Sequence, residues 1–365
     1  MILKSHSVKN YRNIENIEIT PAETVTVISG ENGQGKTNLL ESIWLLSGAK
    51  SFRSSKDEDL IQIGADFSSI TALVEEKTAE LQEKEIKIII GSEKTQKKGR
   101  FASVNGVDYG RATNLAGVFY CVVFEPGHLF LVKGAPATRR KWIDAALCQL
   151  YPSYIETYKR FVRILSQKNA LLRDMKKGKT KKKQEVLDVL NEHFAIYSTK
   201  VVQKRRQYIE DISPFLSEKY SNIARGKEKV SVFCNFSEEE KEEFAKELEK
   251  NRESEIRAGF SLVGPHRDDI DIFLDEKDAK VYASQGQQRS IALCLKLAEA
   301  QQIEKVTGEI PVILLDDVLS ELDTHRKNYL LQDLTEKQVI ITSCEADFLV
   351  NNGGKIYRIE NGKIV

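Results

Sequence analysis

The chain has 365 residues, of which 41% are hydrophobic and 30% are charged, and its formal net charge is +1. This is the composition of a soluble globular protein with more than one lobe. No stretch approaches the roughly 20 apolar residues of a membrane span, and the first residues lack the apolar core of a signal peptide. The five cysteines form no CxxC pair, so neither a disulfide framework nor a zinc site is expected, and a cytoplasmic location is expected.

The first third of the chain predicts short β-strands. The Asn105-Gly106 pair follows one of these runs directly and is a strong hairpin signal. Residues from about 60 to 125 are therefore expected to form antiparallel sheet. The β-rich runs are 17–20, 25–29, 69–74, 85–90 and 100–104.

The middle, from Arg139 to about Arg257, is predicted to be helical and is highly charged. Residues 159–206 contain fifteen Lys/Arg against four Asp/Glu, whereas 237–255 contain nine Glu against four Lys/Arg. The positive charge of the first block and the negative charge of the second offset each other, so neither is evident from the net charge of the chain. Ser237, with Glu240 three residues later, predicts a capping box at the start of the second block. The first block includes a basic turn with Lys176, Lys177, Lys181, Lys182 and Lys183.

The last third returns to alternating helices and strands. A helix is expected over 287–306, a continuous apolar strand over 312–315 and another strand over 338–343. Together with the first third, this predicts an α/β fold.

A GxxxxGK[ST] motif lies between the predicted strand 25–29 and a helix with apolar residues at Leu39, Leu40 and Ile43. In this context the motif predicts a phosphate-binding loop, because its backbone N–H groups and the helix N-terminus surround an anion. Lys36 is then expected on the β- and γ-phosphates of ATP, and the Thr37 hydroxyl on Mg²⁺. The motif residues are Gly30, Glu31, Asn32, Gly33, Gln34, Gly35, Lys36 and Thr37.

The apolar strand 312–315 ends in two carboxylates, Asp316 and Asp317. Taken alone, this pattern also fits a strand followed by an Asx turn. Paired with the phosphate loop, it predicts that Asp316 holds Mg²⁺ and that Asp317 orients or deprotonates the attacking water. The following residues, 320–323, read SELD and resemble the D-loop of ABC ATPases.

A second anion-binding motif is predicted at Ser284, Gly286 and Gln287, within the sequence ASQGQQR. It resembles the ABC signature, although taken alone the pattern favours an ordinary helix N-cap at Ser284. The order of the motifs along the chain resembles ABC-type ATPases, in which each signature faces the nucleotide of a partner head. The expected fold is an ABC-type P-loop ATPase head, a mixed sheet with an antiparallel β subdomain, formed by 1–133 and 303–365. A helical second lobe is expected over 134–302.

Further blocks resemble the RecF family specifically: VKNYRN at 8–13, SFRS at 51–54, FEP at 124–126, LVKG at 131–134 and GPHRDD at 264–269. The resemblance implies a cytoplasmic recombination-repair ATPase linked to the SOS response. Such a protein dimerises with ATP, binds duplex DNA and duplex–single-strand junctions, and acts with RecR and RecO in loading RecA. It also implies nucleotide contacts for Arg12 and Asn13, and a role for Arg53 in coupling DNA to nucleotide, although Arg53 is equally well a surface residue.

The sequence departs from ABC patterns in three ways. First, Gly127 and His128 stand where acidic residues are expected, and no Gln-loop glutamine is evident there. Second, no switch histidine follows the last strand, where Thr342 and Ser343 stand. Third, the second acidic residue after the strand is Asp317 rather than Glu. The alternative function is the ATPase subunit of an ABC transporter, which the RecF-like blocks disfavour. A nuclease of the overcoming-lysogeny-defect type would need a catalytic domain after Asp317, and a GTPase would need an NKxD motif.

Overall fold

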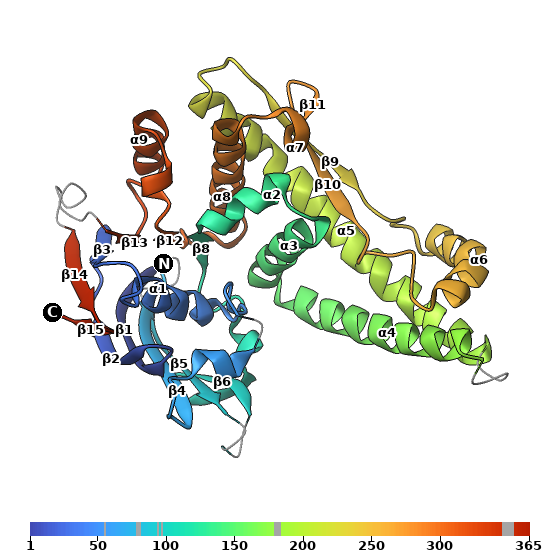
Figure 1. Ribbon diagram of the computed structural model, residues 1–365, viewed down its shortest axis with the longest axis horizontal. Coiled ribbons are helices and arrows are strands. Elements are labelled where there is room, and N and C mark those ends of the chain that lie inside the picture. Colours follow the sequence, from blue (N-terminus) through green and yellow to red (C-terminus); the bar gives the residue numbers. More distant parts are fainter. Residues whose placement is uncertain (55, 78–81, 93–94, 96–97, 179–183, 345–353) are drawn as a thin grey trace. The chain divides into compact units, whose positions relative to one another are not determined.

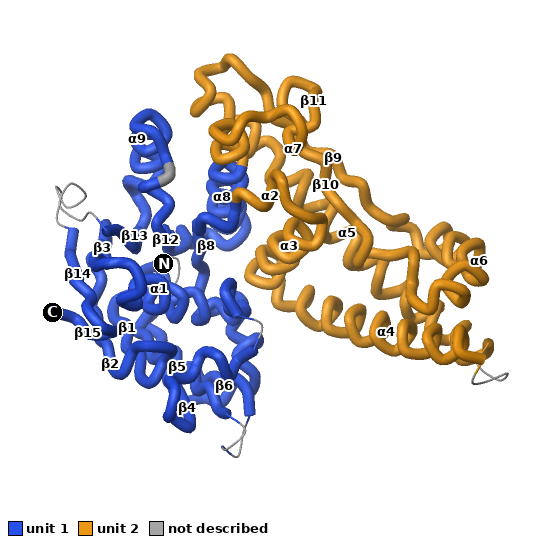
Figure 2. The backbone as a smooth tube through the Cα atoms, viewed as in Figure 1, with its two compact units in different colours: residues 1–128, 292–365 blue, residues 129–291 orange. Residues whose placement is uncertain are grey.

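The computed structural model describes residues 1–54, 56–77, 82–92, 95, 98–178, 184–344 and 354–365 (Figure 1). The chain divides into two compact units (Figure 2). Unit 1 contains residues 1–128 and 292–365, and unit 2 contains residues 129–291. The lobe boundaries expected from the sequence, after residues 133 and 302, and the assignment of ATPase roles to the lobes stay predictions.

Unit 1 contains an antiparallel sheet of six strands in the order β2-β1-β4-β5-β6-β7. In β4, Ile70, Ala72 and Val74 are buried whereas the intervening residues are only partly so, as expected for a sheet with one covered face. The predicted hairpin is confirmed, because Val104 pairs with Val107 across Asn105-Gly106. The strands are β1 (Ile2–Tyr11), β2 (Ile14–Ile19), β4 (Phe67–Glu75), β5 (Glu83–Gly91), β6 (Gly99–Val104) and β7 (Val107–Arg111).

The second sheet of unit 1 has the order β15-β14-β3-β13-β12-β8, and neighbouring strands from β14 to β8 are parallel. Parallel strands direct their carboxyl ends to one edge, so the ends of β3 and β12 lie on the same side. One apolar core joins α1 to both sheets. The strands are β3 (Val25–Ser29), β8 (Cys121–Phe124), β12 (Val312–Asp316), β13 (Val339–Ser343), β14 (Lys355–Glu360) and β15 (Lys363–Ile364).

In the described part of unit 1 there are three α-helices, namely α1 (Lys36–Trp44), α9 (Thr324–Asp333) and the part of α8 (Gln285–Thr307) after residue 291. Helix α1 starts directly after the predicted phosphate loop, and Leu39, Leu40 and Ile43 are buried as their spacing predicts. Short 3₁₀ helices span Leu45–Ser47, Asp57–Leu60, Ala112–Leu115, Pro126–Leu129 and Leu319–Glu321.

Unit 2 is mainly helical and has a three-stranded antiparallel sheet in the order β11-β10-β9. Its two long helices, α4 and α5, pack against each other and against α6. The helices are α2 (Phe130–Lys133), α3 (Pro136–Leu150), α4 (Pro152–Lys176), α5 (Gln184–Ile223), α6 (Lys241–Ala258) and α7 (Ala279–Tyr282). The strands are β9 (Val230–Asn235), β10 (Asp269–Leu274) and β11 (Lys277–Asp278).

The predicted capping box at Ser237 is wrong. Helix α6 begins at Lys241 and its N-cap is Glu240. The backbone N–H and hydroxyl of Ser237 instead donate to Asp268 Oδ1, at 2.9 and 2.7 Å. Asp268 is almost fully buried, and a buried carboxylate needs such donors more than an exposed helix end does. The helical prediction for the middle also missed strand β9.

Candidate functional site

The predicted phosphate loop joins the carboxyl end of β3 to the start of α1. Its lysine is turned back into the loop, since Lys36 Nζ donates to the carbonyls of Gly30 at 2.6 Å and Glu31 at 3.0 Å. Gly30 has φ 146°, and a Cβ at this position would lie 2.3 Å from the Ile359 carbonyl oxygen of β14. Only glycine therefore lets the chain leave β3 at this point.

The two acidic residues predicted after β12 have different surroundings. Asp316 Oδ1 accepts hydrogen bonds from Thr37 Oγ1 and Thr342 Oγ1, both at 2.8 Å. The Asp317 backbone N–H also donates to Thr342 Oγ1, at 3.0 Å. Burial raises the pKa of Asp316, and the two threonine hydrogen bonds oppose that rise. The fold thus brings together the phosphate-loop hydroxyl and the strand carboxylate, which lie 279 positions apart in the chain.

Asp317 has a strained backbone, with φ 52°. Its Oδ1 accepts from Ser320 Oγ at 3.1 Å, so a residue of the predicted D-loop holds its carboxylate. Thr342 contacts both Asp316 and Asp317 at the position where the sequence lacks a switch histidine. The hydroxyl of Thr342, which does not titrate, therefore links the Asp316 carboxylate to the Asp317 backbone N–H.

Glu125, directly after β8, is a carboxylate that the sequence analysis did not select. Burial raises its pKa to about 7, opposed mainly by Lys296 and supported by Asp316. Its backbone N–H donates to His128 Nδ1 at 3.1 Å, and burial lowers the pKa of His128. The sequence signal for Glu125 was its place in the FEP block at 124–126.

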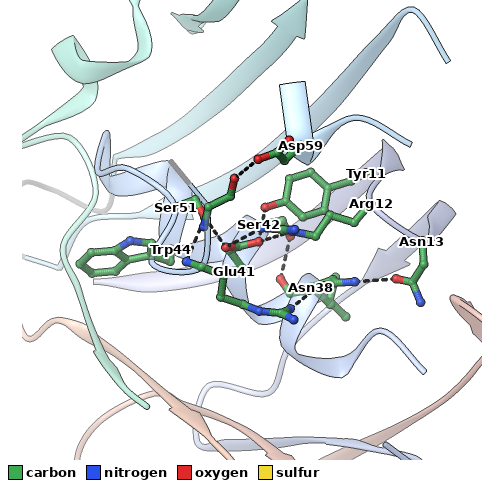
Figure 3. A network of polar contacts seen from close by, with 12 residues as sticks. Tyr11, Arg12, Asn13, Asn38, Glu41, Ser42, Trp44, Ser51 and Asp59 are labelled. Carbon is green, nitrogen blue, oxygen red and sulfur yellow. Dashed lines mark hydrogen bonds and ion pairs between the residues drawn. The ribbon is translucent and has the colours of Figure 1, made fainter. Parts of the chain in front are cut away.

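Behind the phosphate loop, the fully buried Glu41 of α1 accepts hydrogen bonds from three side chains (Figure 3). Tyr11 Oη donates at 2.8 Å, Arg12 Nε at 2.6 Å and Ser51 Oγ at 2.6 Å. A buried carboxylate is stable only with such compensation. Glu41 thus ties the β1–β2 turn, α1 and the loop after α1 to one point. The only sequence signal was a glutamate between buried apolar positions of α1.

The predicted nucleotide residue Asn13 and the candidate DNA residue Arg53 belong to a neighbouring chain of contacts. Arg53 Nη1 donates to Asn38 Oδ1 at 2.6 Å, and Asn38 Nδ2 donates to Asn13 Oδ1 at 2.7 Å. Asn13 Nδ2 in turn donates to the Gly33 carbonyl at 3.4 Å. Figure 3 shows the Asn38 side chain of α1 in contact with the Asn13 side chain. An exposed arginine is therefore connected to the phosphate loop through two amide side chains.

The signature-like motif lies in unit 2, where it opens α8. Ser284 Oγ accepts from the Gln287 backbone N–H at 3.3 Å, and Gln287 Oε1 accepts from the Ser284 N–H at 2.7 Å. This reciprocal pair is a capping arrangement. Gln287 Nε2 also donates to Glu228 Oε1 at 2.7 Å. Ser284 is therefore a helix N-cap, as one interpretation of the sequence predicted. Anion binding by the same motif stays a prediction.

Some cations of the predicted basic segment are neutralised internally. Lys168 pairs with Glu255 at 2.8 Å, and Arg205 Nε pairs with Asp144 at 2.9 Å; all four side chains are buried. Lys176 Nζ donates to the Ala258 carbonyl at the end of α6. Exposed cations remain on α4 and just beyond it, namely Lys159, Arg160, Arg163, Arg173, Lys176 and Lys177. Lys181, Lys182 and Lys183 lie outside the described residues.

Comparison with known proteins decides the family. The model of the RecF/RecN/SMC N terminal domain matches residues 2–363. The DNA replication and repair protein RecF of Staphylococcus aureus (strain JH9) is 37% identical, with 100% of both chains covered. The chain belongs to the RecF family. A protein with the same description from Exiguobacterium sp. is 36% identical over 100% of this chain and 99% of its own.

Solved RecF structures have the same fold. One described as the recombination mediator protein RecF-ATPrS in the RecFOR pathway has a TM-score of 0.91 and 32% identity, covering 100% of this chain and 97% of that one. An Smc head domain from Pyrococcus furiosus, at 16% identity and a TM-score of 0.56, shares the fold alone. The predicted ABC-type ATPase head fold and the resemblance to the RecF family are both confirmed. Within the described residues of this RecF-family chain, no helix is long and apolar enough to cross a membrane.

Proposed function

We propose that this RecF-family protein is an ATP-dependent DNA-binding protein of recombinational repair, acting in the cytoplasm. ATP binding at residues 30–37 drives dimerisation of two heads on duplex DNA or a duplex–single-strand junction, and slow hydrolysis resets the dimer. The dimer helps to load RecA at gaps together with RecR and RecO. The observation that carries the ATPase proposal is the contact of Thr37 with Asp316 beside Lys36.

The donors at this point fit a magnesium ion. Thr37 Oγ1 and Asp316 Oδ1 are hard oxygen atoms 2.8 Å apart at the end of the phosphate loop, which is the ligand type Mg²⁺ prefers. When bound, the ion would neutralise charge on the β- and γ-phosphates. Lys36 binds the same phosphates from the loop side, and Arg12 and Asn13 contribute nucleotide contacts from the β1–β2 turn. Asp317 accepts the proton of the attacking water, with Ser320 holding its carboxylate.

Ser284, Gly286 and Gln287 act in the partner's site rather than in their own. The motif offers a hydroxyl and backbone N–H groups at the start of a long helix, α8, which suits an anionic γ-phosphate. In a two-fold dimer each head supplies this motif once, so two ATP molecules are bound between two heads.

Sedimentation of the purified protein with and without ATP and Mg²⁺ tests this proposal. The wild-type chain should sediment as a dimer only with ATP, whereas Lys36→Ala should remain a monomer, because a triphosphate buried without its main cation is poorly compensated. Lys363→Ala is the matched control, since this exposed lysine pairs only with the equally exposed Glu15 among the contacts described. Dimerisation of Lys36→Ala at wild-type concentrations would refute the assignment of the phosphate loop.

The DNA surface is proposed to be the exposed cations of α4, with Lys176 and Lys177 at its end and Lys181, Lys182 and Lys183 beyond. Such a surface binds the phosphate backbone without reading sequence, and its affinity falls with a log–log salt slope of roughly −0.9 per phosphate neutralised. Arg163→Gln with Lys177→Gln should reduce ATP-dependent duplex binding and flatten that slope. Lys250→Gln, exposed on the glutamate-rich α6, is the control. Unchanged affinity and slope in the double variant would place the DNA surface elsewhere.

A further inference from the structure

The turn of the C-terminal hairpin lies against the phosphate loop. Residues Asn361 and Gly362 join β14 to β15, and both have positive φ, 50° and 72°. The Gly362 backbone N–H donates to the Gln34 carbonyl at 3.0 Å. The Asn361 backbone N–H donates to Gln34 Oε1 at 2.5 Å. The turn therefore holds one residue of the loop by both its backbone and its side chain.

The same turn is wedged against the β1–β2 turn. A Cβ on Gly362 would lie 2.2 Å from the Asn13 carbonyl oxygen and 3.3 Å from Ile14 Cα. Both obstacles are backbone atoms, which cannot move aside as a flexible side chain could. Asn13 itself donates to the Gly33 carbonyl. Two consecutive carbonyls of the loop, those of Gly33 and Gln34, are thus held from outside by two turns from opposite ends of the chain.

Holding these carbonyls has a consequence for the amides. A trans peptide is planar, so its C=O and the following N–H point in opposite directions. If the Gln34 carbonyl is bound to Gly362, the Gly35 N–H must point away from the hairpin; the Gly33 carbonyl orients the Gln34 N–H in the same way. Phosphate binding in such a loop depends on consecutive N–H groups directed at the anion.

We infer that the C-terminal turn is part of the nucleotide site, with Gly362 as a positioning residue that orients the Gly35 amide toward the phosphates of ATP. The inference rests on the proposed ATP binding at this loop. It assigns the last strand pair a role in ligand affinity, in addition to its place at the sheet edge.

The test is the ATP dissociation constant of Gly362→Ala in the full chain, compared with Gly106→Ala. The two glycines match as turn residues, with φ 72° and 77°, but a Cβ on Gly106 meets nothing within 4 Å. Both variants therefore carry similar backbone strain, and only Gly362→Ala displaces the turn from the loop. We expect Gly362→Ala to bind ATP at least about tenfold more weakly and Gly106→Ala to bind as the wild type. The Gly35 amide proton resonance should move on ATP addition in the wild type and much less in Gly362→Ala.

Gln34→Met keeps Gly362 and removes only the side-chain acceptor of the Asn361 N–H. It therefore tests the role of the turn in ATP binding if Gly362→Ala does not fold. A several-fold loss of affinity is expected for it. Wild-type affinity in Gly362→Ala or, failing that variant, in Gln34→Met overturns the inference, as does an equal loss in Gly106→Ala. If the wild type and Lys36→Ala bind ATP equally, the proposed function fails, and the inference fails with it.

Discussion

Replacing the buried Glu41 by Gln should destabilise unit 1, because this carboxylate joins three segments. Gln keeps the shape and one acceptor, but it loses the charge that faces Arg12 and presents an amide N–H₂ group to other donors. Breaking a buried ion pair costs about 3–5 kcal/mol. Here the Arg12 side chain is 17% exposed whereas that of Glu41 is 0% exposed, so Arg12 can regain some water. We therefore expect a loss of about 2 kcal/mol, below the fully buried range.

For a domain of 150–250 residues, that loss lowers the melting temperature by roughly 4–8 °C. Differential scanning calorimetry of the full chain measures it. Glu23→Gln is the matched control, since Glu23 pairs with Lys4 at 2.9 Å but its side chain is 67% exposed. An exposed pair is screened by water and contributes little to stability, so the control should melt close to the wild type. If Glu41→Gln melts as the control does, Glu41 does not anchor the β1–β2 turn.

Three further predictions concern the nucleotide site. Asp317→Asn should bind ATP and keep the dimer while hydrolysing it very slowly, and phosphate release at the wild-type rate would exclude Asp317 as the base. Ser284→Arg should leave ATP binding by the monomer intact and block dimerisation; loss of monomer binding in equilibrium titration would contradict action in trans. The folded-state pKa of Glu125, about 7, lies above the ordinary 4.5, so the stability this group contributes is present at low pH and lost as the pH rises from 4.5 through 7. Glu125→Gln should therefore gain stability relative to the wild type across this window, by up to about 3 kcal/mol in urea titrations, and a pH-independent difference would argue against it.

The elements that the sequence predicted well are those with local signals. The phosphate loop and the strand ending at Asp316 are each short patterns whose residues are neighbours in the chain, and their context of strand and helix could be read directly. The contact of Thr37 with Asp316 followed from the rule that parallel strands end at one edge. Hairpin residues 105 and 106 were likewise predictable, because the turn geometry demands positive φ.

The contacts that could not be predicted are those between distant residues. Glu41 and Tyr11 are 30 positions apart, and Gln34 and Asn361 are 327 apart. Nothing in the local pattern of Glu41 distinguishes an anchor from a solvated helix residue. The capping box predicted at Ser237 was wrong for the same reason, since its local pattern fits a capping box while its hydroxyl donates to Asp268, 31 positions away. Tertiary hydrogen bonding to a buried charge outweighs a local cap.

The number of cationic residues in a segment does not give the charge of its surface, because some of those residues are buried. The excess of cations between residues 159 and 206 suggests a basic surface. However, Lys168 and Arg205 form buried ion pairs inside unit 2 with Glu255 and Asp144. A buried cation with a buried partner contributes little field at the surface, whereas the cations that remain on α4 are exposed. Their charge is screened over about 8 Å at physiological salt, so they act on a phosphate backbone only at close range. Binding through α4 therefore requires DNA to lie along the helix, and long-range attraction by the whole chain, with its net charge of +1, contributes little.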